Sequence, residues 1–137
     1  MTVLADTGVL VSAADVREPR HRDCAEVLRD HHGETIMTAP ALAETSWMIE
    51  SRLGPGAEAR FLRLVTAGEI EVVDLMRDDY LRCTELIETY DDLGLGLVDA
   101  SIVAVAERLG ITTIATLNRR DFAVVRPSHV AAFELVP

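Results

Sequence analysis

The chain contains no lysine, and each of its 13 basic residues is therefore an arginine. A phosphate-binding loop of the Walker type needs a lysine after its glycines, and a Schiff-base enzyme needs one as its nucleophile. Both classes of function are excluded by this absence.

Cysteine and long apolar runs are also scarce. Cys24 and Cys83 stand alone in helical patterns without metal-ligand spacing, so we expect them to be small core residues. No uncharged apolar run reaches the length of about 18 residues that a membrane span requires, because Asp99 interrupts the longest candidate. The N-terminus has no basic residues before its apolar stretch, unlike a secretory signal. These features predict a cytoplasmic protein that does not enter a membrane.

The chain is acidic, with a net charge of −10 over 137 residues, and 49% of its residues are hydrophobic. This length and composition predict one domain over residues 1–137 with a substantial core. Such a chain cannot attract nucleic acid through a broad positive field. It would need local arginine contacts and a bound cation to overcome repulsion.

Short apolar segments alternate with helical patterns along the chain. The segments expected to be strands are residues 2–6, 35–39, 70–75, 112–116 and part of 129–137. The segments expected to be helices begin near residue 9 and cover about 18–33, 41–54, 54–69, 78–90 and the region around Asp99. This alternation predicts an α/β fold whose mostly parallel sheet is covered on both faces.

Four of the 23 acids occupy positions near strand or helix ends: Asp6, Glu44, Asp99 and Asp121. Asp6 and Asp121 follow predicted strands, and Glu44 lies early in the helix after the second strand. Its neighbours on that helix include Trp47 and Met48, which predicts an apolar face. Asp99 lies in the first turn of a helix above an apolar face that we expect to be buried.

Each acid also has an ordinary structural explanation. Asp6 is a candidate helix cap, and Glu44 and Asp99 are candidates to interact with the positive ends of their helices. Asp121 is a candidate loop acid paired with Arg119 or Arg120.

Together the four acids suggest a metal site. In open α/β sheets, functional sites lie beyond the carboxyl ends of the strands. Four carboxylates gathered there would destabilise the fold by several kcal/mol unless a cation lay among them. Carboxylate ligands with water suit Mg²⁺ or Mn²⁺, and such ions promote phosphodiester hydrolysis.

The order of four motifs along the chain supports this interpretation. "VLADTGVLVSAA", "APALAETSWMI", "YDDLGLGLVDASIVAVAERLG" and "IATLNRRDFAVVRP" together resemble the PIN-domain ribonucleases, and more narrowly the VapC toxins of toxin–antitoxin pairs. The resemblance covers essentially the whole chain. It implies a three-layer α/β/α sandwich, a Mg²⁺-dependent endoribonuclease, a homodimer and a cognate VapB-type antitoxin that blocks the site.

The resemblance also assigns roles to individual residues. The first acid of the family falls on Asp6, its helix glutamate on Glu44 and the aspartate of its "DA" motif on Asp99. Some members carry Asp where this chain has Asn118, whereas others carry Asn there and Asp three residues later, as at Asp121. We therefore interpret Asp121 as the fourth acid. The residues expected to support the site are Asn118, Thr116 and Asp92.

The implied reaction is hydrolysis of RNA by a metal-activated water. Asp6 and Asp99 are the expected Mg²⁺ ligands, with Glu44 and Asp121 completing the catalytic set directly or through water, and Mn²⁺ is the expected substitute ion. In-line attack on the scissile phosphate would leave a 3′-hydroxyl and a 5′-phosphate. Arg119 and Arg120 are the first candidates for contacts to flanking phosphates.

Other classes of function fit less well. "ADTG" occurs in retroviral-type aspartic proteases, but those are β-rich and this chain shows repeated helical periodicity. Gly8 stands where an aspartate-based phosphatase would carry its second acid, and a response-regulator receiver would require a lysine. One alternative stays open, a catalytically degenerate PIN-like module that binds RNA or protein without cleaving RNA.

Overall fold

Five short strands form one parallel sheet in the computed structural model, which describes residues 1–137. The strands are β1 (Val3–Ala5), β2 (Thr35–Thr38), β3 (Ile70–Val73), β4 (Thr113–Ala115) and β5 (Glu134–Val136). They lie in the order β3-β2-β1-β4-β5, and every neighbouring pair is parallel. The expectation of a mostly parallel sheet is confirmed, and the sheet is in fact wholly parallel.

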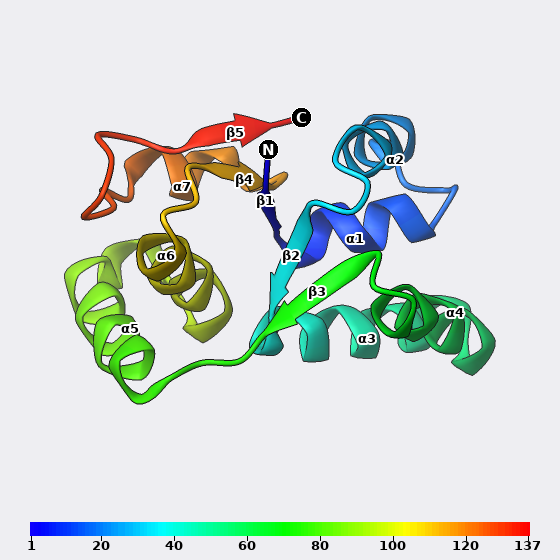
Figure 1. Ribbon diagram of the computed structural model, residues 1–137, viewed down its shortest axis with the longest axis horizontal. Coiled ribbons are helices and arrows are strands. Elements are labelled where there is room, and N and C mark those ends of the chain that lie inside the picture. The colour runs from blue at the N-terminus through cyan, green and yellow to red at the C-terminus, as the bar shows by residue number, and fades with distance from the viewer.

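Seven α-helices cover the two faces of this sheet. They are α1 (Thr7–Ala14), α2 (His21–Asp30), α3 (Ala39–Leu53), α4 (Pro55–Thr66), α5 (Arg77–Thr89), α6 (Leu97–Leu109) and α7 (Arg119–Val124), and a short 3-10 helix, η1 (Asp91–Leu93), precedes α6. Figure 1 shows α1 to α4 on one side of the strands and α5 to α7 on the other. The arrangement is a three-layer α/β/α fold, as expected.

Alternation along the central strands divides the core into two parts. Leu4 and Ile114 face α5 and α6, whereas Val3, Ala5 and Ala115 face the layer of α1 to α4. All five are fully buried. Because both faces are covered, β1 is apolar at every position rather than at alternate ones, and Thr113 is the one polar residue of β4.

Local signals fix the ends of the helices that carry the candidate acids. The side chain of Thr38 caps α3, and Pro40 occupies its first turn, where a missing N–H costs nothing. Gly110 ends α6 in the left-handed conformation at φ 70°, which a residue with a side chain adopts only with strain. Both helices therefore keep a defined register relative to the sheet.

Helix α7 was not predicted from the sequence. Its six residues are too few to show an amphipathic period, and Asn118 caps it by accepting from the backbone N–H of Asp121. The loop position expected for Asp121 is therefore wrong, because it lies in the first turn of this helix, whereas its expected pairing with an arginine is confirmed for Arg120. Helix α2 also begins later than expected, at His21.

The expectation for the two cysteines is confirmed. Cys24 and Cys83 are both buried and unpaired, as core residues should be. None of the helices combines the length and apolar character needed to cross a membrane.

Candidate active site

Asp6 follows β1 and begins α1. One carboxylate oxygen accepts the backbone N–H of Thr7 at 2.8 Å, and the other accepts the hydroxyl of Thr116 at 2.8 Å. Burial raises the pKa of Asp6, and repulsion from Glu44 adds to this, while the two hydrogen bonds lower it. The cap explanation is thus correct for Asp6 but incomplete, because capping does not account for the bond from Thr116 on another strand end.

Asp121 is tied to Asp6 through a chain of hydrogen bonds. The backbone N–H of Asn118 donates to the Thr116 hydroxyl at 2.9 Å, and that hydroxyl donates to Asp6. The Asn118 amide donates to Asp121 at 3.0 Å, and Arg120 pairs with its other oxygen at 3.0 Å. The bond from Asn118 and then the charge of Arg120 lower the pKa of Asp121. Thr116 and Asn118 therefore hold the carboxylates of Asp6 and Asp121 by hydrogen bonds.

Asp99 lies in the first turn of α6 and is half-buried. Its place in that turn fits the expected interaction with the positive end of the helix, but it makes no hydrogen bond to the helix backbone. The helix face beneath it is apolar as expected, since Ile102, Val103 and Ala106 are fully buried. A carboxylate in this position has neither a neutralising partner nor full access to water.

The pKa of Asp99 is raised to about 6, first of all by burial. The other three acids raise it further through their negative charges, in the order Asp6, Asp121 and Glu44. Four carboxylates drawn from α1, α3, α6 and α7 therefore share one electrostatic environment, in which Arg120 is the paired cation.

Glu44 lies in the second turn of α3 and is exposed. Because it is outside the first turn, the explanation that it stabilises the positive end of the helix is weak. The expectation that Glu44 lies on an apolar, buried face is wrong. Trp47 on the same face is 67% exposed, and Ser51 is exposed as well. Glu44 therefore borders the site from the solvent side.

The donor set fits a hard divalent cation in an open site. No three acidic, histidine or cysteine side chains approach closely enough to form a complete metal cage. Mg²⁺ commonly uses only one or two protein carboxylates and keeps several waters, so a closed cage is not required. Asp6 and Asp99, the two acids whose pKa values are raised, would gain most from such a cation.

The remaining predicted residues lie at the margins of this group. Asp92 is exposed in η1. The guanidinium of Arg119 donates to the backbone carbonyls of Leu135 and Pro137, which ties α7 to the C-terminal strand. Arg120 keeps 79% of its side chain exposed while it pairs with Asp121.

The sequence reasoning missed two polar residues beneath the acids, Thr38 and Ser101. Their hydroxyl oxygens are 2.8 Å apart, although 63 residues separate them in the chain. Ser101 stands two positions after Asp99, within the long apolar run that Asp99 interrupts. A serine on a helix face that is expected to be buried is the sequence feature that could have indicated this contact.

Comparison with known proteins identifies the family of this chain. The family model described as PIN domain matches residues 3–126. The chain is 29% identical to Ribonuclease VapC26 of Mycobacterium tuberculosis over 136 residues, which cover 98% of this chain and 100% of that protein.

Two solved structures share the fold. A crystal structure of Mycobacterium tuberculosis VapC20, described as a sarcin-ricin loop cleaving toxin, superposes with a TM-score of 0.80 at 17% identity, over 87% of this chain and 92% of that one. A toxin–antitoxin complex from Klebsiella pneumoniae superposes with a TM-score of 0.72 at 20% identity, over 99% of this chain and 97% of that one. The match of the family model over most of the chain, together with the parallel sheet and its helices, shows that this protein belongs to the PIN-domain family.

Proposed function

We propose that this protein is a Mg²⁺-dependent endoribonuclease and the toxin of a VapBC-type toxin–antitoxin pair. The observation that carries the proposal is the carboxylate of Asp99. It is half-buried, accepts no hydrogen bond, and lies in the field of three other acids. Such a group destabilises the metal-free protein, and binding a divalent cation reverses that cost.

Each acid has a defined task in this proposal. Asp6 is held by Thr7 and Thr116, so its oxygens have fixed directions toward a cation. Asp99 offers an unencumbered carboxylate from the rigid start of α6, and Glu44 reaches the site from the solvent side. When bound, Mg²⁺ would supply a water nucleophile at neutral pH and positive charge for the scissile phosphate.

The substrate would enter past the exposed edge of the site. Glu44 and Arg120 are both solvent-exposed there, and Arg120 carries the positive charge nearest the acids. A guanidinium can bind a phosphate oxygen while it stays paired with Asp121, because it has five donors in a fixed fork. This supports Arg120 over Arg119 as a contact to RNA, since Arg119 is engaged with the C-terminal strand.

A groove lined by α1, α2 and α4 suits the antitoxin. It has a volume of about 410 Å³, and eight of its ten lining residues are hydrophobic. They are contributed by α1, α2 and α4: Leu10, Ala13, Ala14, Ala25, Leu28, Arg29, Ala57, Arg60, Phe61 and Leu64. An apolar helix of a partner would bury this surface.

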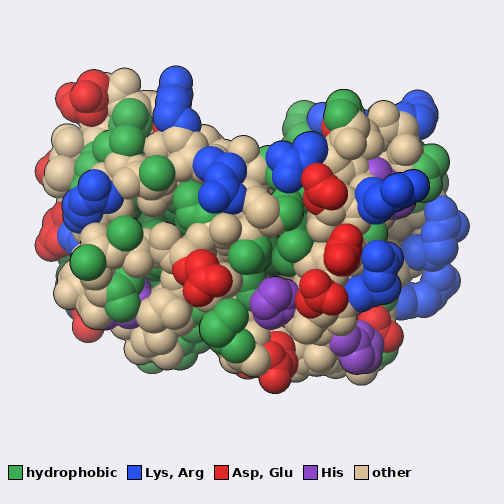
Figure 2. Space-filling model, turned by 90° about the horizontal axis from the view of Figure 1, so that it is seen from above, with side chains coloured by type: hydrophobic (Ala, Val, Ile, Leu, Met, Phe, Trp, Pro, Cys, Tyr) green, Lys and Arg blue, Asp and Glu red, His purple; other side chains and the backbone are tan.

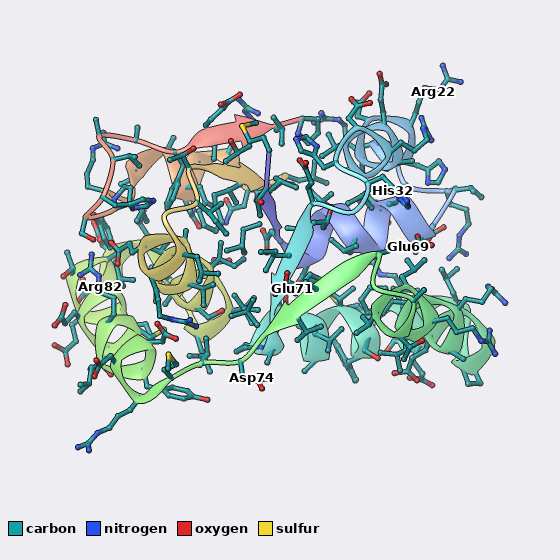
Figure 3. The ribbon with its side chains drawn as sticks, in the orientation of Figure 1. Arg22, His32, Glu69, Glu71, Asp74 and Arg82 are labelled. Carbon is teal, nitrogen blue, oxygen red and sulfur yellow. The ribbon has the colours of Figure 1, made fainter.

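The charge around the groove restricts the partner further. Arg29 and Arg60 line it, and neither forms an ion pair within the chain. Figure 2 shows basic side chains gathered at the end of the molecule that holds α2, and Figure 3 shows Arg22 pointing outward from that helix. In a protein of net charge −10, this basic end favours an apolar segment that also carries acids.

The homodimer that the family resemblance implies stays a prediction. Tyr80 and Leu81 on α5 are 53% and 57% exposed, and together they offer apolar surface for a second copy. Sedimentation equilibrium of the isolated protein measures the state directly, and a mass of one chain at micromolar concentration would contradict the dimer.

The test of the proposed activity is cleavage of structured and single-stranded RNA by purified protein with Mg²⁺, with Mn²⁺ and with excess chelator. We expect cleavage with either metal, none with chelator, and none from Asp99→Asn prepared in parallel. The Asn variant controls for contaminating ribonuclease. Metal binding without cleavage of any RNA would favour the alternative, a degenerate module that binds RNA or protein.

The antitoxin site is tested with the product of the adjacent reading frame. Leu28→Asp places a charge in the apolar groove and should weaken binding at least about tenfold, because the charge must be desolvated. Leu109→Asp, at a 44% exposed position on α6, is the matched control. Equal binding by both variants in calorimetry would exclude the groove, and RNA cleavage by Leu28→Asp should be unchanged.

A further inference from the structure

A chain of buried hydroxyl groups joins the two helices that carry Glu44 and Asp99. The backbone N–H of Ala41 donates to the Thr38 hydroxyl at 3.3 Å, and the two hydroxyls of Thr38 and Ser101 are 2.8 Å apart. The Ser101 hydroxyl donates to the carbonyl of Val98 at 2.7 Å. Both hydroxyl residues are 0% exposed.

These contacts fix the direction of every proton in the chain. Ser101 uses its only hydroxyl proton on Val98, so it must accept from Thr38. Thr38 in turn accepts from the N–H of Ala41 while it donates to Ser101. Each hydroxyl donates once and accepts once, and the loss of either one leaves the other in the interior with one hydrogen bond instead of two.

The apolar cores to which α3 and α6 contribute lie on opposite sides of the sheet. The buried residues of α3, Ala41 and Ile49, belong to the core on one side of the sheet. The buried apolar residues of α6 belong to the core on the other side, and Val98 is the α6 residue that packs against both. Thr38, the last residue of β2 and the cap of α3, contacts Ser101 of α6, and this hydrogen bond has a direction that apolar contacts lack.

The chain ends in the short stretch that carries Asp99. Val98 accepts the last hydrogen bond, Ser101 donates it, and Asp99 lies between them in the first turn of α6. At the other end Thr38 caps α3, which presents Glu44 in its second turn. The separation of the two carboxylates therefore depends on the contact between the two hydroxyls.

We propose that Thr38 and Ser101 are positioning residues that set the spacing between Asp99 and Glu44, and through it the affinity of the site for a divalent cation. The proposal rests on the proposed function, since it assigns a support to that metal site. It gives the Asp99–Glu44 half of the site a link equivalent to the one that Thr116 provides between Asp6 and Asp121.

The test measures Mn²⁺ binding by the metal-free protein, through the electron paramagnetic resonance signal of free Mn²⁺, and RNA cleavage at saturating Mn²⁺. We expect Thr38→Val and Ser101→Ala each to weaken Mn²⁺ binding by about tenfold. The double variant should be no weaker than either single one, because both substitutions break the same chain. Thr38→Ser keeps the hydroxyl and should restore binding.

Thr45→Val is the matched control. Thr45 lies on α3 next to Glu44 and is 0% exposed, but its hydroxyl has no hydrogen-bond partner. Its removal should leave the affinity for Mn²⁺ within about twofold of the wild-type value. If Thr45→Val weakens binding as much as Thr38→Val, general loosening of α3 explains the result and the positioning role is wrong.

Two further outcomes separate this proposal from the proposed function. Wild-type affinity in Thr38→Val and Ser101→Ala, with the wild type active on RNA, overturns the positioning role and leaves the ribonuclease intact. A wild-type protein that neither binds Mn²⁺ nor cleaves RNA overturns both. If Thr38→Val does not fold, Ser101→Ala and Thr38→Ser still decide the question, because one removes a hydroxyl and the other keeps it.

Discussion

Asp6 and Asp121 are held by hydrogen bonds from neighbouring residues, whereas Asp99 and Glu44 accept none from the protein. The first pair lies over β1 and β4, where Thr116 and Asn118 join strand ends that are adjacent in the sheet. The second pair lies on helices α3 and α6, and its only support is the hydrogen bond between the hydroxyls of Thr38 and Ser101. The carboxylates of Asp6 and Asp121 are therefore held directly by hydrogen bonds. Those of Asp99 and Glu44 are held only through the helices that carry them.

This difference separates two causes of strain in the metal-free protein. The hydrogen bonds to Asp6 and Asp121 offset part of the cost of gathering negative charge. Nothing offsets the cost at Asp99, whose pKa is raised to about 6. We infer that a cation relieves the second half more than the first, and the following predictions test that inference.

The largest expected effect comes from removing one carboxylate from each half. Asp6→Ala and Asp99→Ala should each lower kcat on RNA by roughly 100-fold or more, because each removes a proposed ligand of the cation that would supply positive charge to the scissile phosphate. Only Asp6→Ala should also lower the free energy of unfolding, by about 1–2 kcal/mol, since it deletes the cap of α1. Steady-state kinetics and urea denaturation measure the two quantities. Equal losses of stability would show that the halves do not differ.

The link within the first half is the next to break. Thr116→Val keeps the shape of a fully buried residue but removes the donor to Asp6 and the acceptor for the Asn118 N–H. Loss of such a support typically costs about 10- to 100-fold in metal affinity or activity. Thr113→Val, at the far end of the same strand, is the control, and its hydroxyl reaches only the sulfur of Met1. If Thr116→Val requires the same Mg²⁺ concentration as the wild type, the hydrogen bond from Thr7 is enough to orient Asp6.

The sequence predicted the first half of the site better than the second. Asp6 and Thr116 stand directly after apolar strands, and parallel strands bring such ends together whatever the details of the fold. Glu44 is carried by a helix, and its exposure depends on how α3 is rotated, which the apolar neighbours in its sequence did not reveal. Trp47, taken as a sign of a buried face, is largely exposed.

Two features could not be predicted because they depend on tertiary contacts. Helix α7 is too short to show a period, and its cap is an asparagine whose amide also reaches Asp121. The pairing of Thr38 with Ser101 joins residues far apart in the chain. Each residue alone reads as an ordinary cap or a small helical residue, and their partnership follows only from the packing of α3 beside α6.

The strain at Asp99 predicts an unusual pH dependence of stability. Its pKa rises from 3.8 in the unfolded chain to about 6 in the folded metal-free protein, so folding disfavours the charged form. The free energy of unfolding should therefore fall as the pH rises from about 4 to about 6, and stay level above that range. A shift of this size corresponds to about 3 kcal/mol, which partial exposure to solvent reduces to about 1–2 kcal/mol.

The measurement compares wild type and Asp99→Asn in chelator across this range. The Asn variant should be more stable at pH 7, and the difference should shrink as the pH falls and vanish below about pH 3, where Asp99 is protonated in both folded and unfolded states. Glu88→Gln, which removes an exposed acid from α5, should follow the wild-type curve. A variant no more stable than wild type at pH 7 would show that Asp99 carries no strain.

The smallest expected effect concerns Arg120. Its guanidinium neutralises Asp121 in one half of the site, whereas Asp99 in the other half has no cation beside it. Its side chain is 79% exposed, so its ion pair with Asp121 contributes less than about 1 kcal/mol to stability, and Arg120→Ala should leave unfolding almost unchanged. The same substitution should raise KM for RNA a few-fold, since it removes a phosphate contact at the rim, while kcat stays within about twofold. Arg126→Ala, which removes an arginine bound to the backbone carbonyl of Ala123, is the control for general charge. A lower kcat with an unchanged KM would mean that Arg120 acts by holding Asp121 in place. Arg120 would then be a positioning residue and not a contact to RNA.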